Sequence, residues 1–168
     1  MTELESFRAG KDRFFATHPE SPLTSEQKWG FEGLHYFPEN PALRREVVVE
    51  EFPQKEAIQM QTTTGGIQTY TRFGKFKFTV GGQEAELTLY AGPHGYFLPF
   101  ADSLAGTEPY SAGCDLDPEP VGSGQFLVDF NLAYNPYCAY NENFSCPIPP
   151  RENRLKVQIR AGEKSFRE

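Results

Sequence analysis

The residues best suited to chemistry lie in the run DFNLAYNPYCAY, residues 129–140. If this run begins as a strand, Val128 and Phe130 share one face and Asp129 and Asn131 share the other. The apolar face belongs to a core. The two polar side chains then face water or line a cavity, where they would hold a ligand hydroxyl, an amine or a hard cation. The alternative is that both side chains cap the irregular backbone that follows.

Three tyrosines, Tyr134, Tyr137 and Tyr140, recur at every third position of this run. The spacing suits one face of a helical turn, but Asn135-Pro136 opposes a regular helix because proline biases the preceding residue toward extended geometry. We therefore expect a compact loop of stacked rings. These rings and the Asn135 amide would form the wall of a small-molecule pocket, with the phenol hydroxyls as polar handles. The alternative is a loop anchored by buried rings.

The three cysteines offer weak signals for metal binding or catalysis. Cys138 and Cys146 are eight residues apart, and structural zinc needs four ligands, usually with closer spacing, so Cys114 and a histidine would have to complete the site. A nucleophilic Cys138 would need an adjacent base, and no histidine is near it in sequence. We interpret each cysteine as a buried, reduced small hydrophobe and predict no metal site.

Residues 101–125 contain five acidic residues and neither Lys nor Arg. We interpret the segment as a loop, and loops longer than about 12–15 residues are usually functional or disordered. We therefore place the hypothetical pocket between this loop and residues 129–140, with Glu108 and Tyr110 as further contacts. The alternative is a plain acidic surface loop.

The elements that must position these residues begin with a helical arm over residues 1–30, which we expect to lie over one side of a sheet. Thr2 is followed three residues later by Glu5, and Thr24 by Gln27, and each pair forms a capping box at a helix start. Apolar residues then recur at near-helical spacing until His18-Pro19 ends the first helix.

From residue 31 the apolar period changes to two, which is typical of strands. Gly81-Gly82 forms a two-residue hairpin loop that sets Phe78 opposite Ala85. Gly65-Gly66 predicts a second hairpin with Ile58 opposite Phe73. Between the loops the apolar parity slips by one, and a bulge at Gly74 would absorb the slip.

Further strands are expected near 125–130 and 154–160. The predicted fold is mainly β (α+β), an antiparallel meander curling into a barrel or a bent sandwich, with the N-terminal helical arm. Aromatic residues make up 14% of the chain, which favours strands packed through rings. At 168 residues we expect one domain, with the meander over 31–100 and the final strand within 126–168.

Charge and composition argue against several classes of protein function. A net charge of −7 and a pI near 5.1 argue against nucleic-acid binding, which needs a basic face. No apolar run approaches the ~18 residues of a membrane span, and the acidic N-terminus lacks the pattern of a secretion signal, so we predict a cytoplasmic protein. The common nucleotide, hydrolase and zinc-protease motifs are absent from the sequence. The sequence specifies neither a cofactor nor an oligomeric state.

The run at 129–140, the following SCPIPPREN and the closing AGEK at 161–164 resemble the signature of domain-of-unknown-function family 1684, an uncharacterised bacterial and archaeal family. The resemblance extends over nearly the whole chain and implies a domain definition without an activity. Its pattern includes two pairs of adjacent, oppositely charged residues, Lys11-Asp12 and Glu163-Lys164. We expect some of these charges to pair across the fold and link the arm to the sheet.

Three functional hypotheses follow. The first is a small-molecule-binding domain, with or without catalysis, whose ligand contacts come from the polar and aromatic residues of 129–140: Asp129, Asn131, Tyr134, Asn135, Tyr137, Cys138 and Tyr140. The alternative is a non-catalytic interaction or structural module. The third is a metalloprotein that uses cysteine and histidine.

Overall fold

The computed structural model describes residues 2–93, 95–103, 113–141 and 143–166. Its N-terminal arm contains two helices, α1 (Glu3–Thr17) and α2 (Ser25–Trp29). Both predicted capping boxes are present, with Thr2 and Thr24 at the N-caps. The helix starts were therefore predictable from local side-chain hydrogen bonding.

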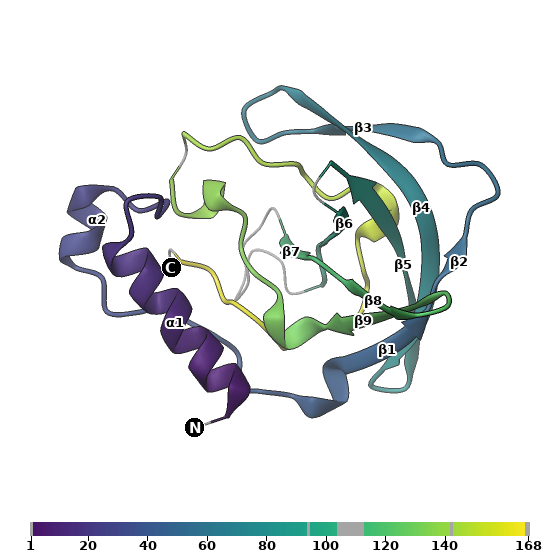
Figure 1. The fold of residues 1–168 in the computed structure, drawn as a ribbon, viewed down its shortest axis with the longest axis horizontal. Helices are drawn as coiled ribbons and strands as arrows, with labels where there is room; N and C mark the ends of the chain where they lie inside the picture. The colour runs from purple at the N-terminus through teal and green to yellow at the C-terminus, as the bar shows by residue number, and fades with distance from the viewer. Residues whose placement is uncertain (1, 94, 104–112, 142, 167–168) are drawn as a thin grey trace.

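The larger sheet has the strand order β2-β4-β5-β6-β7, and β3 also pairs with β4. The strand bounds are β2 (Glu50–Glu51), β3 (Ala57–Gln61), β4 (Ile67–Val80), β5 (Gln83–Gly92), β6 (Gly95–Phe100) and β7 (Cys114–Leu116). Every pairing is antiparallel. Figure 1 shows that this sheet curves around the middle of the molecule.

A smaller antiparallel sheet, ordered β1-β9-β8, faces the curved one. Its strands are β1 (Arg44–Val48), β8 (Glu119–Gly122) and β9 (Gln125–Asp129). One hydrophobic cluster spans both sheets and includes Phe76 and Leu87 from the larger sheet and Phe126 and Val128 from the smaller. The architecture is the bent sandwich of the two predicted alternatives, and the described strands do not close into a barrel (Figure 1).

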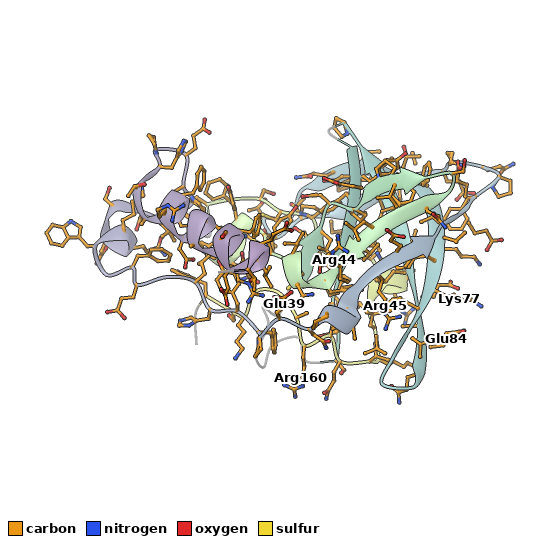
Figure 2. The ribbon with its side chains drawn as sticks, turned by 60° about the horizontal axis from the view of Figure 1, so that its bottom comes forward. Glu39, Arg44, Arg45, Lys77, Glu84 and Arg160 are labelled. Atoms are coloured by element: carbon orange, nitrogen blue, oxygen red, sulfur yellow. The ribbon has the colours of Figure 1, made fainter. Side chains whose placement is uncertain are left out.

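The helical arm lies beside the sandwich rather than over its strands (Figures 1 and 2). It packs through a second cluster of rings, in which Phe15 of α1 meets Tyr140 edge-on at 4.9 Å and Tyr137 edge-on at 6.3 Å between ring centres. Tyr137 belongs to one turn of 3-10 helix, η3 (Tyr137–Ala139). The expected compact loop is present, but its rings meet edge-on rather than stacked. Tyr137 and Tyr140 contact the arm, and Tyr134 lies outside this cluster.

The hairpin at Gly81-Gly82 has the predicted register. Phe78 lies opposite Ala85 and Phe76 opposite Leu87. On the outer face, the Lys77 Nζ lies 3.7 Å from the Glu84 Oε1, and Figure 2 shows the two side chains together on this hairpin.

The register predicted for the second hairpin is wrong. Ile58 lies opposite Tyr70 rather than Phe73, because the loop contains residues 62–66 instead of the glycine pair alone. Thr62 closes this wider loop: its N–H donates to the Gly66 carbonyl at 2.9 Å, and its hydroxyl accepts from the Gly66 N–H at 3.0 Å. A side-chain hydrogen bond of this kind competes with the tightest glycine turn.

The bulge at Gly74 is confirmed by a shift in the β4–β5 register between Arg72 and Gly74. A side chain could not occupy this position. A Cβ on Gly74 would lie 2.7 Å from both the carbonyl oxygen of Glu50 and a methyl group of Val49, where β2 pairs with β4.

Two further expectations were wrong. The segment interpreted as a loop over 101–125 contains β7 and β8. The segment 154–160, expected to be a strand, alternates in burial but bends at residues 156 and 157 and forms only a single bridge, Ala101 with Arg154. Its backbone is held by isolated bonds, such as that from the Ile159 N–H to Asp102 Oδ2 at 2.6 Å, so burial periodicity there exists without a ladder.

Four short 3-10 turns complete the described structure. Besides η3 they are η1 (Pro41–Leu43), η2 (Phe130–Leu132) and η4 (Arg151–Asn153). No helix among the described residues is both long and apolar enough to cross a membrane.

Candidate ligand-binding site

Glu163 is the centre of a buried polar network that joins the helical arm to residues 129–140. Its side chain is 2% exposed and forms an ion pair with Lys11 of α1. The carboxylate also accepts hydrogen bonds from the Tyr140 hydroxyl and, at 3.0 Å, from the Asn135 backbone N–H. The expected charge pairing across the fold is confirmed, between residues 152 positions apart.

The other polar atoms of this network also bond within the protein. Asn135 Nδ2 donates to the carbonyl of Lys164 at 2.9 Å, and Asn135 Oδ1 lies 3.9 Å from Cys114 Sγ. Burial and then the Glu163 charge raise the pKa of Tyr140, so its phenol stays a neutral donor. In this structure Asn135 and Tyr140 position the arm and the carboxylate.

Asp129 and Asn131 follow the capping alternative. Asp129 is the N-cap of η2, and its Oδ1 accepts bonds from the N–H and the Nδ2 of Asn131, both at 3.0 Å. Asn131 is buried, and its side chain accepts a hydrogen bond from the Asn40 N–H and donates one to the Asn40 carbonyl. Asp129 is 15% exposed, with Arg44 Nε at 3.8 Å from its Oδ2.

The three cysteines are free and buried, as expected of small hydrophobic side chains. The Cys138 N–H donates to Cys146 Sγ at 3.3 Å. A side-chain hydrogen bond with Cys138, then burial, raises the pKa of Cys146, and burial raises that of Cys114. Raised pKa values keep these thiols protonated and weaken them as nucleophiles. Across the described part of the chain, no group of three or more His, Cys, Asp or Glu side chains could hold a metal ion.

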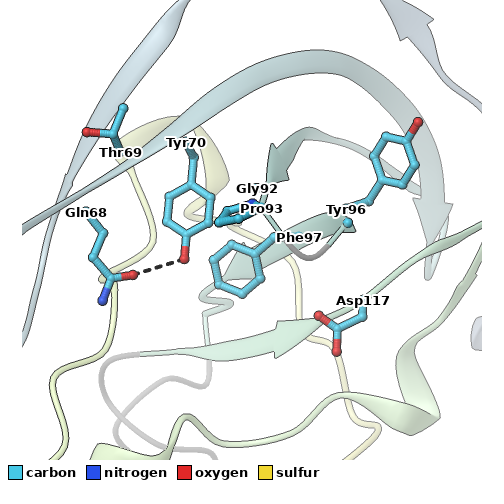
Figure 3. Close-up of a pocket in the computed structure, with 9 residues that line it drawn as sticks. Gln68, Thr69, Tyr70, Gly92, Pro93, Tyr96, Phe97 and Asp117 are labelled. Atoms are coloured by element: carbon cyan, nitrogen blue, oxygen red, sulfur yellow. Dashed lines mark hydrogen bonds between the residues drawn. The ribbon is translucent and has the colours of Figure 1, made fainter.

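A cavity of about 510 Å³ opens between β4, β6 and the end of β7; we call it the aromatic cavity. One wall is a stacked pair, Tyr70 and Phe97, with ring centres 5.1 Å apart. The Tyr70 hydroxyl donates to Gln68 Oε1 at 3.1 Å. Figure 3 shows the two rings between Gln68 on one side and the Asp117 carboxylate on the other. Gly92 supports the wall: a Cβ there would lie 3.0 Å from the Tyr70 ring.

Two carboxyl groups lie at β7, and one of them, Asp117, lines this cavity. Cys114 and Leu116 point into the core, so Asp115 and the following Asp117 project from the opposite face. Asp117 is exposed, and its Oδ2 accepts a hydrogen bond from the Tyr134 hydroxyl at 2.9 Å. Asp115 is 6% exposed. Burial, and then the nearby Asp117 charge, raise its pKa well above that of an ordinary carboxyl.

Asp117 also lines a second cavity of about 270 Å³, which we call the apolar cavity. Phe7 of α1 and Leu132 contribute exposed apolar side chains to it. Asp129 and Tyr134, two of the predicted site residues, lie in its wall. The structure therefore brings these two together beside Asp117, while Asn131, Asn135 and Tyr140 bond within the protein and line neither cavity.

Glu108 and Tyr110 lie outside the described residues. Sequence reasoning missed Tyr70, Phe97 and Asp117, although Asp117 carried a signal. In Cys114-Asp115-Leu116-Asp117 apolar and acidic residues alternate, which is the pattern of a half-buried strand. The dense glycines and prolines around it favoured a loop instead.

A family model described as "Protein of unknown function (DUF1684)" matches residues 29–164. The chain belongs to this family. The matched range contains β1 to β9 and Glu163 of this chain.

Among solved structures, the chain is similar to an uncharacterised protein of Haloarcula marismortui, determined by solution NMR. The two are 33% identical with a TM-score of 0.73, and the alignment covers 99% of this chain and 94% of the other. That coverage includes the helical arm, which precedes the region matched by the family model. No curated protein matches the chain.

Proposed function

We propose that this protein is a small-molecule-binding domain whose ligand occupies the aromatic cavity. The observation that carries the proposal is the cavity itself. Its volume of about 510 Å³ falls within the range of ligand sites, roughly 300–1,000 Å³. Ligand sites typically combine an aromatic wall with a few convergent polar groups. Here the stacked Tyr70 and Phe97 supply the wall, and Gln68 and Asp117 supply the polar groups.

The surroundings of Asp117 support the same site. The Tyr134 hydroxyl holds one carboxylate oxygen, which restricts the orientation of the other. Asp115 behind it has a raised pKa, and buried groups with perturbed pKa values concentrate at functional sites. Asp129 and Tyr134 thus contribute through the adjoining apolar cavity, with Tyr134 acting on Asp117.

A fragment screen observed by protein NMR tests the proposal, with wild-type protein and two variants. Tyr70→Leu removes one ring of the stacked pair and the hydrogen bond to Gln68. Trp29→Leu is the control, because that ring is 92% exposed and lies in α2, outside the cavity wall. We expect at least one fragment to shift the resonances of Gln68 and Phe97 saturably in the wild type and in Trp29→Leu, and not in Tyr70→Leu. Saturable shifts nowhere in the cavity would refute the proposal.

A further inference from the structure

The charge of the aromatic cavity is carried by one side chain. Asp117 is the single charged residue among the described residues that line it. Its Oδ2 is bound by the Tyr134 hydroxyl, and no described residue donates a hydrogen bond to its Oδ1. Of the described lysines and arginines, none forms an ion pair with it. The cavity thus presents a carboxylate oxygen that a ligand can reach.

A second carboxyl, Asp115, lies near Asp117 but does not line the cavity. Asp115 is 6% exposed, and burial and then the charge of Asp117 raise its pKa. The Lys11 Nζ lies 5.2 Å from the centre of the Tyr134 ring and is already paired with Glu163. Because burial disfavours its charged form and raises its pKa, Asp115 adds little negative charge, and Asp117 remains the carboxylate that faces the cavity.

The ring wall matches the same ligand chemistry. A cation within about 6 Å of an aromatic ring centre is attracted by the negative face of the ring. An anion, by contrast, would be repelled by the Asp117 carboxylate, and a neutral ligand that displaced water would leave the Asp117 oxygen without a partner.

We propose that the aromatic cavity binds an organic cation, an amine or quaternary ammonium compound with an apolar or aromatic body, whose charged nitrogen contacts Asp117. The inference rests on the proposed function, since it names the ligand class of that same cavity. The body lies against Tyr70 and Phe97, and the ammonium group supplies the partner that Asp117 Oδ1 lacks within the described protein.

Three matched probes test the charge preference: phenethylammonium, the neutral 2-phenylethanol and the anionic phenylacetate. Each is titrated against the isotope-labelled full chain, and dissociation constants are taken from the resonances of Gln68, Tyr70 and Phe97. We expect the cation to bind at least tenfold more tightly than the alcohol, and the anion not to saturate. Asp117→Asn should weaken cation binding tenfold to a hundredfold and leave alcohol binding unchanged. Glu119→Gln, which changes a neighbouring exposed charge outside this cavity, should leave all three unchanged.

The outcomes separate this inference from the proposal on which it rests. If the alcohol or the anion saturates the cavity as tightly as the cation, or if Asp117→Asn leaves cation binding intact, the inference is overturned while ligand binding in the cavity stands. If neither these probes nor any fragment of the screen saturates the cavity, both fail. Because Asp117 is exposed, Asp117→Asn should retain the wild-type amide spectrum outside the cavity.

Discussion

Replacing Lys11 by methionine should destabilise this protein far more than replacing any surface lysine. The change keeps the apolar stem of the side chain and removes its charge. Glu163, which is 2% exposed, would then keep hydrogen bonds from Tyr140 and Asn135 but lose its ion-pair partner. The cost arises because a carboxylate cannot regain in the protein interior the hydration that it lost on folding.

The magnitude follows from the burial of the two partners. Removing one partner of a buried ion pair costs about 3–5 kcal/mol. Lys11 is 19% exposed and Glu163 retains two hydrogen bonds, so we expect about 2–3 kcal/mol. For a domain of this length 1 kcal/mol lowers Tm by about 2–4 °C, so Lys11→Met should melt about 4–12 °C below the wild type.

Urea denaturation of four proteins measures this contribution: wild type, Lys11→Met, Glu163→Gln and the double variant. Glutamine keeps acceptor oxygen for Tyr140 and Asn135, so the double variant should be no less stable than Lys11→Met alone, with a coupling energy of about 1–2 kcal/mol. Lys77→Met is the matched control, since Lys77 is 62% exposed and its pair with Glu84 should contribute at most about 1 kcal/mol. If Lys11→Met unfolds like Lys77→Met, or if the two single changes are additive, the reasoning about the buried pair is refuted.

Three further substitutions test other parts of the structure. Because the pKa of Asp115 is higher in the folded protein than in the unfolded chain, the wild type loses stability as pH rises from the unfolded-state pKa to the folded-state pKa, by about 1.4 kcal/mol for each pH unit between them. Asp115→Asn removes that loss. The free energy of unfolding of the variant minus that of the wild type, measured in urea, should therefore increase as pH is raised from 4 to 8. A difference that does not change with pH would contradict the raised pKa. Asn153→Ala should cost about 3 kcal/mol or more in the same assay, because the fully buried amide binds both backbone groups of Thr88, and a loss below about 1 kcal/mol would show that water replaces it. Gly162→Ala should lower Tm by several degrees, since φ is 83° and the new Cβ would lie 2.7 Å from a carbonyl oxygen, whereas Gly30→Ala, with no atom within 4 Å of its Cβ, should not.

The elements predicted correctly depend on neighbours in sequence. The two capping boxes pair Thr2 with Glu5 and Thr24 with Gln27, three residues apart. The Gly81-Gly82 turn sets the register of its hairpin because both glycines adopt positive φ, at 58° and 80°. The bulge at Gly74 was predictable because the parity of the apolar residues in the sequence changes on either side of it.

The errors arose where a more distant partner or a competing side chain decided the outcome. At 62–66 the hydroxyl of Thr62 stabilises a wider loop than the glycine pair suggested. At β7 the alternation of Cys114 to Asp117 is strand-like, but its partner is β6, with Leu98 opposite Leu116 and residues 101–113 of the chain between the two strands. Over 154–160 the burial alternates without a neighbouring strand to complete a ladder.

By itself the sequence determined the family, the helical arm, the β-rich class, the Gly81-Gly82 hairpin and the expectation that charges at the two ends of the chain would meet. Only the tertiary structure decided that Lys11 pairs with Glu163, that Asp129 and Asn131 cap the backbone, and that the aromatic cavity lies elsewhere. The physical reason is that caps and turns are satisfied within a few residues, whereas a cavity has no local signal. Its wall forms only when β4, β6 and β7, each with its own pattern, are brought together by the burial of a shared core.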